Sequence, residues 1–283
     1  MSEVTMRDTT ATLATAEAAA MTPRRGAPAW LAWRNWGPTL ITFIIAAALW
    51  QFVAITNPYV IPTIDAIVTS LVQDAGMYWS NFLVTLLEVV VGAASGILAG
   101  FLLAVIMAEF RIIERAVMPL VVIVMVTPIV AIAPALVVAF GFGMIPKFIV
   151  TALVVFFPML VNALAGLRDV DQRALDVMTT LHASRWEIFR ELRLPGCMPY
   201  VFAGLRIALP LAVVGAAVAE FVAAGQQAGL GSLVTTSAAQ ANLPVTWGAI
   251  ALLCVLGVLL IVLLALTRKR VLWWSDGEVT AKG

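Results

Sequence analysis

The chain has 283 residues, of which 62% are hydrophobic and only 12% are charged, and its formal net charge is +1. Its mean hydropathy of +1.02 is higher than that of a soluble domain, so the composition excludes an ordinary water-soluble protein and predicts an integral membrane protein. In lipid every backbone polar group must be hydrogen-bonded internally, and a helix needs about 20 apolar residues to cross the hydrocarbon core.

Six apolar runs of sufficient length follow one another along the chain, and we expect an all-α membrane protein with six transmembrane helices. They lie near residues 37–55, 80–108, 116–140, 145–167, 204–224 and 245–267. The transmembrane domain is therefore predicted at 29–267. Residues 1–28 read as a disordered cytoplasmic tail rather than a signal peptide, because Glu17 interrupts their only apolar stretch. Residues 268–283 form a cytoplasmic C-terminal tail.

Lys and Arg residues set the expected orientation, because they accumulate in loops that stay in the cytoplasm. They precede the first run, follow the second and the sixth, and surround the polar segment between the fourth and fifth runs; only Lys147 falls on the opposite side. Both termini and the polar segment at 168–200 are therefore predicted to be cytoplasmic. The segments 56–79 and 225–244, which contain no Lys or Arg, are predicted to face outward.

Two carboxylates, Glu88 and Glu220, fall inside the predicted spans, in the outer halves of the second and fifth. Ionisable groups are costly in the membrane, so one interpretation makes them part of a substrate gate in an outward-facing vestibule. The alternative is that Glu220 bonds to backbone or pairs with Lys147 near the outer surface. Two carboxylates with no cation in the membrane would repel an anion and favour a neutral or cationic heterocycle as the solute.

Small residues and prolines mark the packing of the spans. Gly92, Gly96 and Gly100 form a seam on the second run that predicts close helix packing within the chain, with a dimer interface as the alternative. Prolines interrupt the third, fourth and fifth runs and predict kinks there. They are Pro128, Pro134, Pro158 and Pro210.

The polar segment between the fourth and fifth spans predicts two short helices joined by a sharp turn at residues 182–184. Asp169 and Gln172 have the spacing of a capping box, and Ser184 and Glu187 repeat it. The second helix is expected to end before Pro195. The apolar faces would carry Ala174, Met178 and Leu181 on the first helix, and Ile188, Phe189 and Leu192 on the second. An amphipathic hairpin lying on the membrane surface is the alternative.

Catalytic chemistry has little support in the sequence. Two cysteines and one histidine are too few for an ordinary metal site, and we predict none. A phosphate-binding loop, a metalloprotease pair and a nucleophile elbow are all missing from the sequence, so the chain is not expected to hydrolyse ATP unaided. An intramembrane enzyme would also need a nucleophile and a base within the spans.

The polar segment resembles the EAA loop of ABC-importer permeases, which docks on an ATP-hydrolysing subunit. Asp176 stands at the acidic position of that loop, Leu181 matches directly, and His182 replaces the usual glycine. The order of features over roughly residues 60–265 is similar to binding-protein-dependent permeases that import alkanesulfonates, taurine, nitrate and thiamine-pyrimidine precursors. Further matching segments are 183–186, 194–195, 199–200, 203–206, 134–135, 140–141, 156–158, 219–221 and 229–231.

The resemblance implies a fold like that of type I ABC importers, with a cytoplasmic coupling helix between the fourth and fifth spans. His182 either adopts the positive φ of the replaced glycine or makes a polar contact to the partner subunit. The implied ATPase-coupling residues are Asp176, Thr179, Thr180, Leu181, His182, Ala183, Ser184, Arg185 and Trp186. The implied substrate pathway or gate includes Glu88, Glu220, Pro134 and Phe140.

The same resemblance implies the partners of the chain. They are two copies of an ATP-binding subunit that hold ATP and Mg²⁺, a second permease, expected to be another copy of this chain, a solute-binding protein, and the lipid of the bacterial inner membrane. No cofactor on this chain and no nucleic acid are expected. The alternative function is a secondary transporter or channel in which Glu88 and Glu220 relay protons, although that reading leaves the polar segment unexplained.

Overall fold

The computed structural model describes residues 33–223 and 228–272, and these residues form two units that divide after Pro58. The first unit contains one described helix, α2 (Trp33–Thr56), which is long and apolar enough to cross a membrane. The predicted tail at 1–28 lies outside the described residues.

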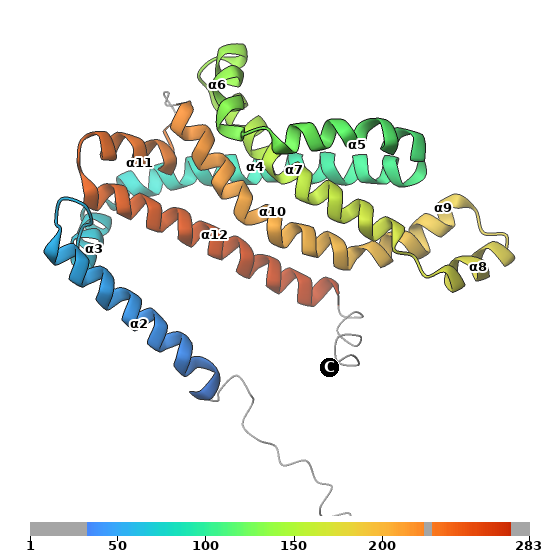
Figure 1. Cartoon of the computed structure of the whole chain (residues 1–283), viewed down its shortest axis with the longest axis horizontal. Coiled ribbons are helices and arrows are strands. Elements are labelled where there is room, and N and C mark those ends of the chain that lie inside the picture. Colours follow the sequence, from blue (N-terminus) through green and yellow to red (C-terminus); the bar gives the residue numbers. More distant parts are fainter. Residues whose placement is uncertain (1–32, 224–227, 273–283) are drawn as a thin grey trace, which may run out of the picture. The chain divides into compact units, whose positions relative to one another are not determined.

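The second unit is built on three long helices that pack side by side (Figure 1). They are α4 (Ala75–Glu109), α7 (Met144–Arg168) and α10 (Leu194–Val222), and α12 (Leu243–Val271) lies along α10. Their shared core contains Ala104, Met107, Leu160, Ala163, Leu164, Cys197 and Val201. The described residues contain helices and no β-strand, which confirms the predicted all-α fold. Helix α12 runs to Val271, so the predicted C-terminal tail begins later than residue 268.

The glycine seam of α4 packs within the chain, as favoured from the sequence. A Cβ atom built on Gly92 would overlap the side chain of Thr151, and one built on Gly100 would lie 2.7 Å from the carbonyl oxygen of Phe156. Both contacts are with α7. The missing side chains therefore let the backbones of α4 and α7 approach closely.

The third predicted span is broken rather than straight. Helix α5 (Arg111–Val126) and helix α6 (Ile129–Phe140) meet at a bend of 97°. The break falls at Pro128, which has no N–H to donate, and the preceding Thr127 takes the extended conformation that a following proline favours. Counting this bent pair as one span gives six spans in the described chain, as predicted. Pro134, Pro158 and Pro210 lie inside their helices and do not break them.

The fifth span begins earlier than the sequence predicted, and the expected stop before Pro195 is wrong. Helix α9 (Arg185–Ile188) leads into a π-helical turn (Phe189–Arg193), which leads directly into α10. The backbone N–H of Leu194 donates to the carbonyl of Phe189, one residue further back than in an α-helix. Pro195 follows directly after the π-helical turn, and its missing N–H does not end the helix. Residues 185–222 therefore make one continuous rod of 38 residues.

Two shorter helices lie in the segments predicted to face outward. Helix α3 (Ile64–Gln73) precedes α4, and helix α11 (Leu230–Ala239) packs against α4, α10 and α12. Leu230 is fully buried in a small core with Tyr78, Val245 and Ala249. At 10 residues each, neither helix is long enough to cross a membrane.

Adding a single methyl group at Gly96 tests the close packing of α4 on α7. A Cβ atom there would lie 2.9 Å from the Cα of Ala152, a backbone atom that cannot move alone. We expect Gly96→Ala to lower the free energy of unfolding by about 1–3 kcal/mol, measured as a fall in the melting temperature in detergent. Gly257→Ala is the matched control, because a Cβ at Gly257 meets nothing within 4 Å. Equal melting temperatures for both variants would contradict the packing argument.

Candidate functional site

The polar segment folds into a hairpin of two short helices, here called the hairpin (residues 172–188). Its first helix, α8 (Gln172–Thr180), begins after Asp171, whose side chain accepts a hydrogen bond of 2.9 Å from the backbone N–H of Arg173. The predicted capping box of Asp169 and Gln172 is therefore wrong. Asp169 directly follows the end of α7 and accepts a hydrogen bond from the Tyr200 hydroxyl, so the capping of α8 falls to Asp171, the carboxylate next to that helix.

His182 takes the left-handed conformation that glycine usually supplies, with φ of 56°. Its N–H and that of Ala183 donate to the carbonyls of Thr179 and Met178, each at 3.0 Å, and these bonds close the end of α8. One of the two expectations for this residue, a turn with positive φ, is thus confirmed. Histidine visits this region more readily than most residues other than glycine.

Ser184 starts the second helix with the predicted capping box. The N–H of Glu187 donates to the Ser184 hydroxyl at 3.3 Å, and the N–H of Ser184 donates to the Glu187 carboxylate at 2.7 Å. These hydrogen bonds, the backbone one first, lower the pKa of Glu187 below its ordinary value, so the cap is charged at neutral pH. The turn at residues 181–184 is thereby fixed on both sides.

The tip of the hairpin presents apolar side chains to its surroundings. Leu181 is 72% exposed and Trp186 is 67% exposed, and the Trp186 ring stacks on Phe189 with centroids 5.7 Å apart. The hydroxyls of Thr179 and Thr180 donate to carbonyls one turn earlier in α8. The sequence-predicted coupling residues are all exposed except Ala183, which is partly buried. The structure thus brings the coupling set together in one small exposed element.

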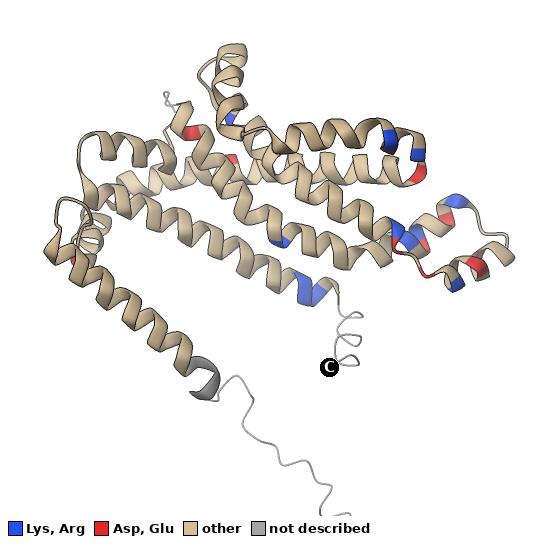
Figure 2. Cartoon of the chain, in the orientation of Figure 1, with Lys and Arg blue, Asp and Glu red and all other residues tan. Residues whose placement is uncertain are grey.

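Both ends of the hairpin are tied to the corner between α4 and α5, and the sequence did not predict these ties. Arg168, which ends α7, makes a two-pronged ion pair with Glu114. Arg193, which ends the π-helical turn, pairs with Glu109 at 2.8 Å. Figure 2 shows Lys and Arg gathered at this end of the second unit. Each exposed pair alone contributes little stability, but together they set the direction of the hairpin.

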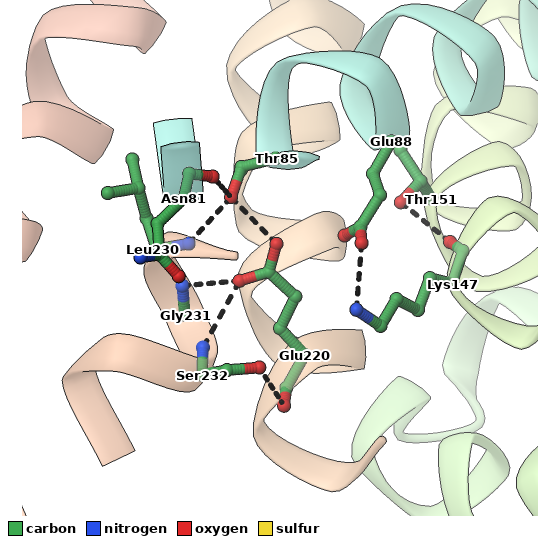
Figure 3. Close-up of polar contacts among 9 residues, drawn as sticks. All are labelled: Asn81, Thr85, Glu88, Lys147, Thr151, Glu220, Leu230, Gly231 and Ser232. Carbon is green, nitrogen blue, oxygen red and sulfur yellow. Dashed lines mark hydrogen bonds and ion pairs between the residues drawn. The ribbon is translucent and has the colours of Figure 1, made fainter. Parts of the chain in front are cut away.

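A second polar group lies near the other end of the bundle, where three ionisable side chains are buried together (Figure 3). Glu88 of α4, Lys147 of α7 and Glu220 of α10 are each at most 1% exposed. The Lys147 ammonium donates to Oε1 of Glu88 at 2.9 Å. The sequence argument that left the two carboxylates with no cation in the membrane is therefore wrong. Lys147 occupies the first turn of α7, where the bundle already surrounds it.

Glu220 uses its carboxylate to hold the start of α11. One oxygen accepts from the Thr85 hydroxyl at 2.7 Å, and the other accepts from the backbone N–H groups of Gly231 and Ser232. The Thr85 hydroxyl in turn accepts from the N–H of Leu230 at 2.8 Å. The interpretation that Glu220 bonds to backbone is confirmed. Thr85 and Ser232 were not found from the sequence, although the segment 229–231 was marked as matching the family.

The Glu88 carboxylate has one oxygen, Oε2, that is buried with no hydrogen-bond partner among the described residues. Together, the Glu88–Lys147 ion pair and the hydrogen bonds of Glu220 join helices α4, α7, α10 and α11.

Pro134 and Phe140 do not join this cluster. Both are exposed on α6, whereas the hydrogen bonds around Glu220 and Glu88 come from α4, α7, α10 and α11. Helix α6 instead packs through Ala133 against Val150 of α7 and Ala219 of α10. The predicted pathway set is thus divided between a buried cluster and an exposed helix.

Comparisons with known proteins agree with this arrangement. Residues 96–272 match the family described as binding-protein-dependent transport system inner membrane component. The chain is 32% identical over 239 residues to a probable ABC transporter permease protein of Haemophilus influenzae, covering 83% of this chain and 96% of that protein. It is 34% identical to the formylaminopyrimidine transport permease protein ThiX of Halalkalibacterium halodurans, covering 78% and 89%. It is 30% identical to the riboflavin transport system permease protein RibX of Chloroflexus aurantiacus, covering 71% and 75%.

Substitutions at His182 test the turn of the hairpin. We expect His182→Gly to keep the turn, because glycine adopts positive φ without cost, and His182→Val to destabilise it by about 1–2 kcal/mol, because a β-branched residue does not. The measurement is amide hydrogen exchange of residues 181–188, which should speed up only in the valine variant. Similar exchange in both variants would show that the turn does not depend on this conformation.

Substitutions at Glu220 test the link to α11. Glu220→Leu should leave buried backbone N–H groups unpaired at a cost of about 1–3 kcal/mol each, and Glu220→Gln should cost less because one acceptor oxygen remains. The melting temperature should therefore fall in the order wild type, Gln, Leu. Thr235→Ala is the control, since the Thr235 hydroxyl bonds only to carbonyls of its own helix. A leucine variant as stable as the control would be inconsistent with the link.

Proposed function

The chain belongs to the family of binding-protein-dependent transport system inner membrane components, and from this premise we propose that it is the permease subunit of an ATP-driven importer. It is a transport subunit rather than an enzyme, as the names of its relatives indicate. Its task is to open a path for a small solute that a solute-binding protein delivers, and to close that path again. The chemistry of ATP hydrolysis resides on a partner.

The hairpin is the element that receives the motion of that partner. Its exposed apolar tip, Leu181 and Trp186, offers the kind of anchor that fills a groove on another protein. Its two ends are held by Arg168 and Arg193, so a force on the tip is passed to the bundle rather than lost in a flexible loop. This combination of an exposed tip and a braced base is the observation that carries the proposal.

The continuous rod of residues 185–222 gives the motion a route across the bundle. At about 1.5 Å per residue its 38 residues extend on the order of 55 Å, enough to reach from the hairpin to the outer end. Glu220 lies near the far end of the rod and holds α11. A displacement of the hairpin therefore moves α10 and α11 together, which is a physical basis for alternating access.

The complete transporter contains more than this chain. We infer two permease subunits, with a second copy of this chain as the partner, two ATP-binding subunits that hold ATP and Mg²⁺, and a solute-binding protein on the outer side. The Lys and Arg residues at the hairpin end support a cytoplasmic position for that end, in the inner membrane of a bacterium (Figure 2). No cofactor on this chain and no nucleic acid enter the mechanism.

A small heterocycle is the solute class that we favour. Two relatives of 34% and 30% identity carry formylaminopyrimidine and riboflavin in their names. Repulsion by Glu88 and Glu220 does not exclude an anionic solute, because Lys147 compensates the charge of Glu88. Uptake of a labelled aminopyrimidine is compared with uptake of labelled taurine in cells that contain the whole transporter. Uptake of the aminopyrimidine alone indicates a heterocycle, and uptake of taurine alone indicates a sulfonate.

A secondary transporter that relays protons through Glu88 and Glu220 is the second candidate, and the unpartnered oxygen of Glu88 is the observation in its favour. That candidate gives no role to the hairpin. Purification of the chain from its native membrane separates the two functions. An ATP-driven importer retains a subunit with a phosphate-binding loop, whereas a secondary transporter does not.

Truncation of the hairpin tip tests the coupling role. We expect Trp186→Ala to release the ATP-binding subunit or to reduce transport-coupled ATP hydrolysis at least tenfold, because an aromatic anchor in a protein interface contributes about 2 kcal/mol or more. ATPase activity of the reconstituted transporter with the solute-binding protein present is the measurement. Replacement of residues 179–186 by Gly and Ser should abolish coupling while membrane insertion stays intact.

The matched control is Trp79→Ala. Trp79 is 62% exposed and stacks on Phe82 with centroids 5.7 Å apart, so it has the same surroundings as Trp186 but lies near the outer start of α4. It should leave retention of the ATP-binding subunit unchanged. Normal coupling in the Trp186 variant, or equal losses in both variants, would refute the docking role of the hairpin.

A further inference from the structure

A cavity of about 990 Å³ lies between the hairpin and the corner where α4 meets α5, and one of its lining residues, Arg185, also belongs to the predicted coupling set. Its lining comes from the end of α4, the start of α5, the end of α7, both hairpin helices and the π-helical turn. The volume falls within the range of ligand pockets, about 300–1,000 Å³. The cavity is therefore large enough for a ligand of small-molecule size.

The wall of this cavity is strongly basic. Four arginines line it, Arg111, Arg168, Arg185 and Arg193, against a single carboxylate, Glu109. Arg168 and Arg193 are engaged by Glu114 and Glu109. Arg111 and Arg185 take part in no ion pair with any residue in the described ranges and are exposed. Two exposed guanidinium groups that line the cavity, one from α5 and one from α9, are thus available to an anion.

Apolar side chains at the corner between α4 and α5 also line the cavity, on either side of Arg111 in the sequence. Phe110 and Ile112, at the corner, are exposed, and Ile112 is 84% exposed. Leu102 and Ile106 on α4 are also exposed and lead to the corner from the membrane-spanning part of that helix. The cavity therefore sits where the apolar surface ends and the charged surface begins, at the level of the lipid headgroups.

We propose that this cavity binds the phosphate headgroup of an anionic phospholipid from the adjacent leaflet. Arginine is suited to phosphate because its planar guanidinium donates two parallel hydrogen bonds, and basic pockets between helices on the cytoplasmic side bind such headgroups. Arg111 and Arg185 hold the phosphate, and an acyl chain lies along Ile112 and the exposed face of α4. The bound lipid joins the hairpin to the α4–α5 corner and reinforces the two protein ion pairs.

The test is lipid binding to the purified full-length protein, with its partner subunits, in detergent. Phosphatidylglycerol is titrated and followed by native mass spectrometry, with phosphatidylcholine and inorganic phosphate as separate arms. We expect Arg111→Gln/Arg185→Gln to weaken phosphatidylglycerol binding about 30-fold, and Arg111→Gln alone about fivefold. Arg111 lies outside the hairpin, so Arg111→Gln still tests the cavity if the double variant disturbs the fold of the hairpin.

Arg115→Gln/Arg173→Gln is the matched control, because these two arginines belong to α5 and α8 but do not line the cavity. It should bind phosphatidylglycerol as the wild type does. Equal affinity of the cavity variant and the control, or equal binding of phosphatidylcholine, overturns the proposal. Displacement of the lipid by inorganic phosphate assigns the site to a free anion. If the Arg111→Gln/Arg185→Gln variant loses the ATP-binding subunit but binds lipid as the wild type does, the cavity belongs to a protein interface and the proposal is overturned.

Discussion

The continuity of the helix from Arg185 to Val222 is the constraint on which the rest of the structure depends. A π-helical turn and a proline lie in its first third, yet the helical backbone continues past both without a loop. The second helix of the hairpin and Glu220 therefore belong to one continuous helix, which links the hairpin to the buried polar cluster. A continuous helix is a physical means by which distant sites can influence each other.

Polar contacts hold both ends of this helix. At the hairpin end two partly exposed ion pairs join the hairpin to the corner between α4 and α5. At the other end Glu220 is fully buried, and each oxygen of its carboxylate has a donor. Loss of those donors in a low dielectric is expensive, so the link between α10 and α11 is the stronger of the two.

Much of this could be predicted from the sequence, because several signals are local. Runs of apolar residues gave the spans, and the spacing of Ser184 and Glu187 gave a cap that the structure contains. Signals that depend on tertiary packing were missed. Lys147 reads as an outer-loop cation until α4 and α10 are placed around it, and Asp169 and Asp171 cannot be told apart as caps without knowing where α7 ends. Likewise, Pro195 predicts the end of a helix unless the preceding turn is known to be π-helical. Of the four prolines that predicted kinks, Pro128 alone lies at a break in a span.

Hydrogen–deuterium exchange of the membrane-embedded chain, compared with and without an ATP-binding subunit, shows whether the hairpin docks on that subunit. Amides of residues 177–188 should become protected on assembly, while those of α12 should not change. Unchanged exchange in the hairpin, with protection arising elsewhere on the chain, would show that the subunit does not dock on the hairpin.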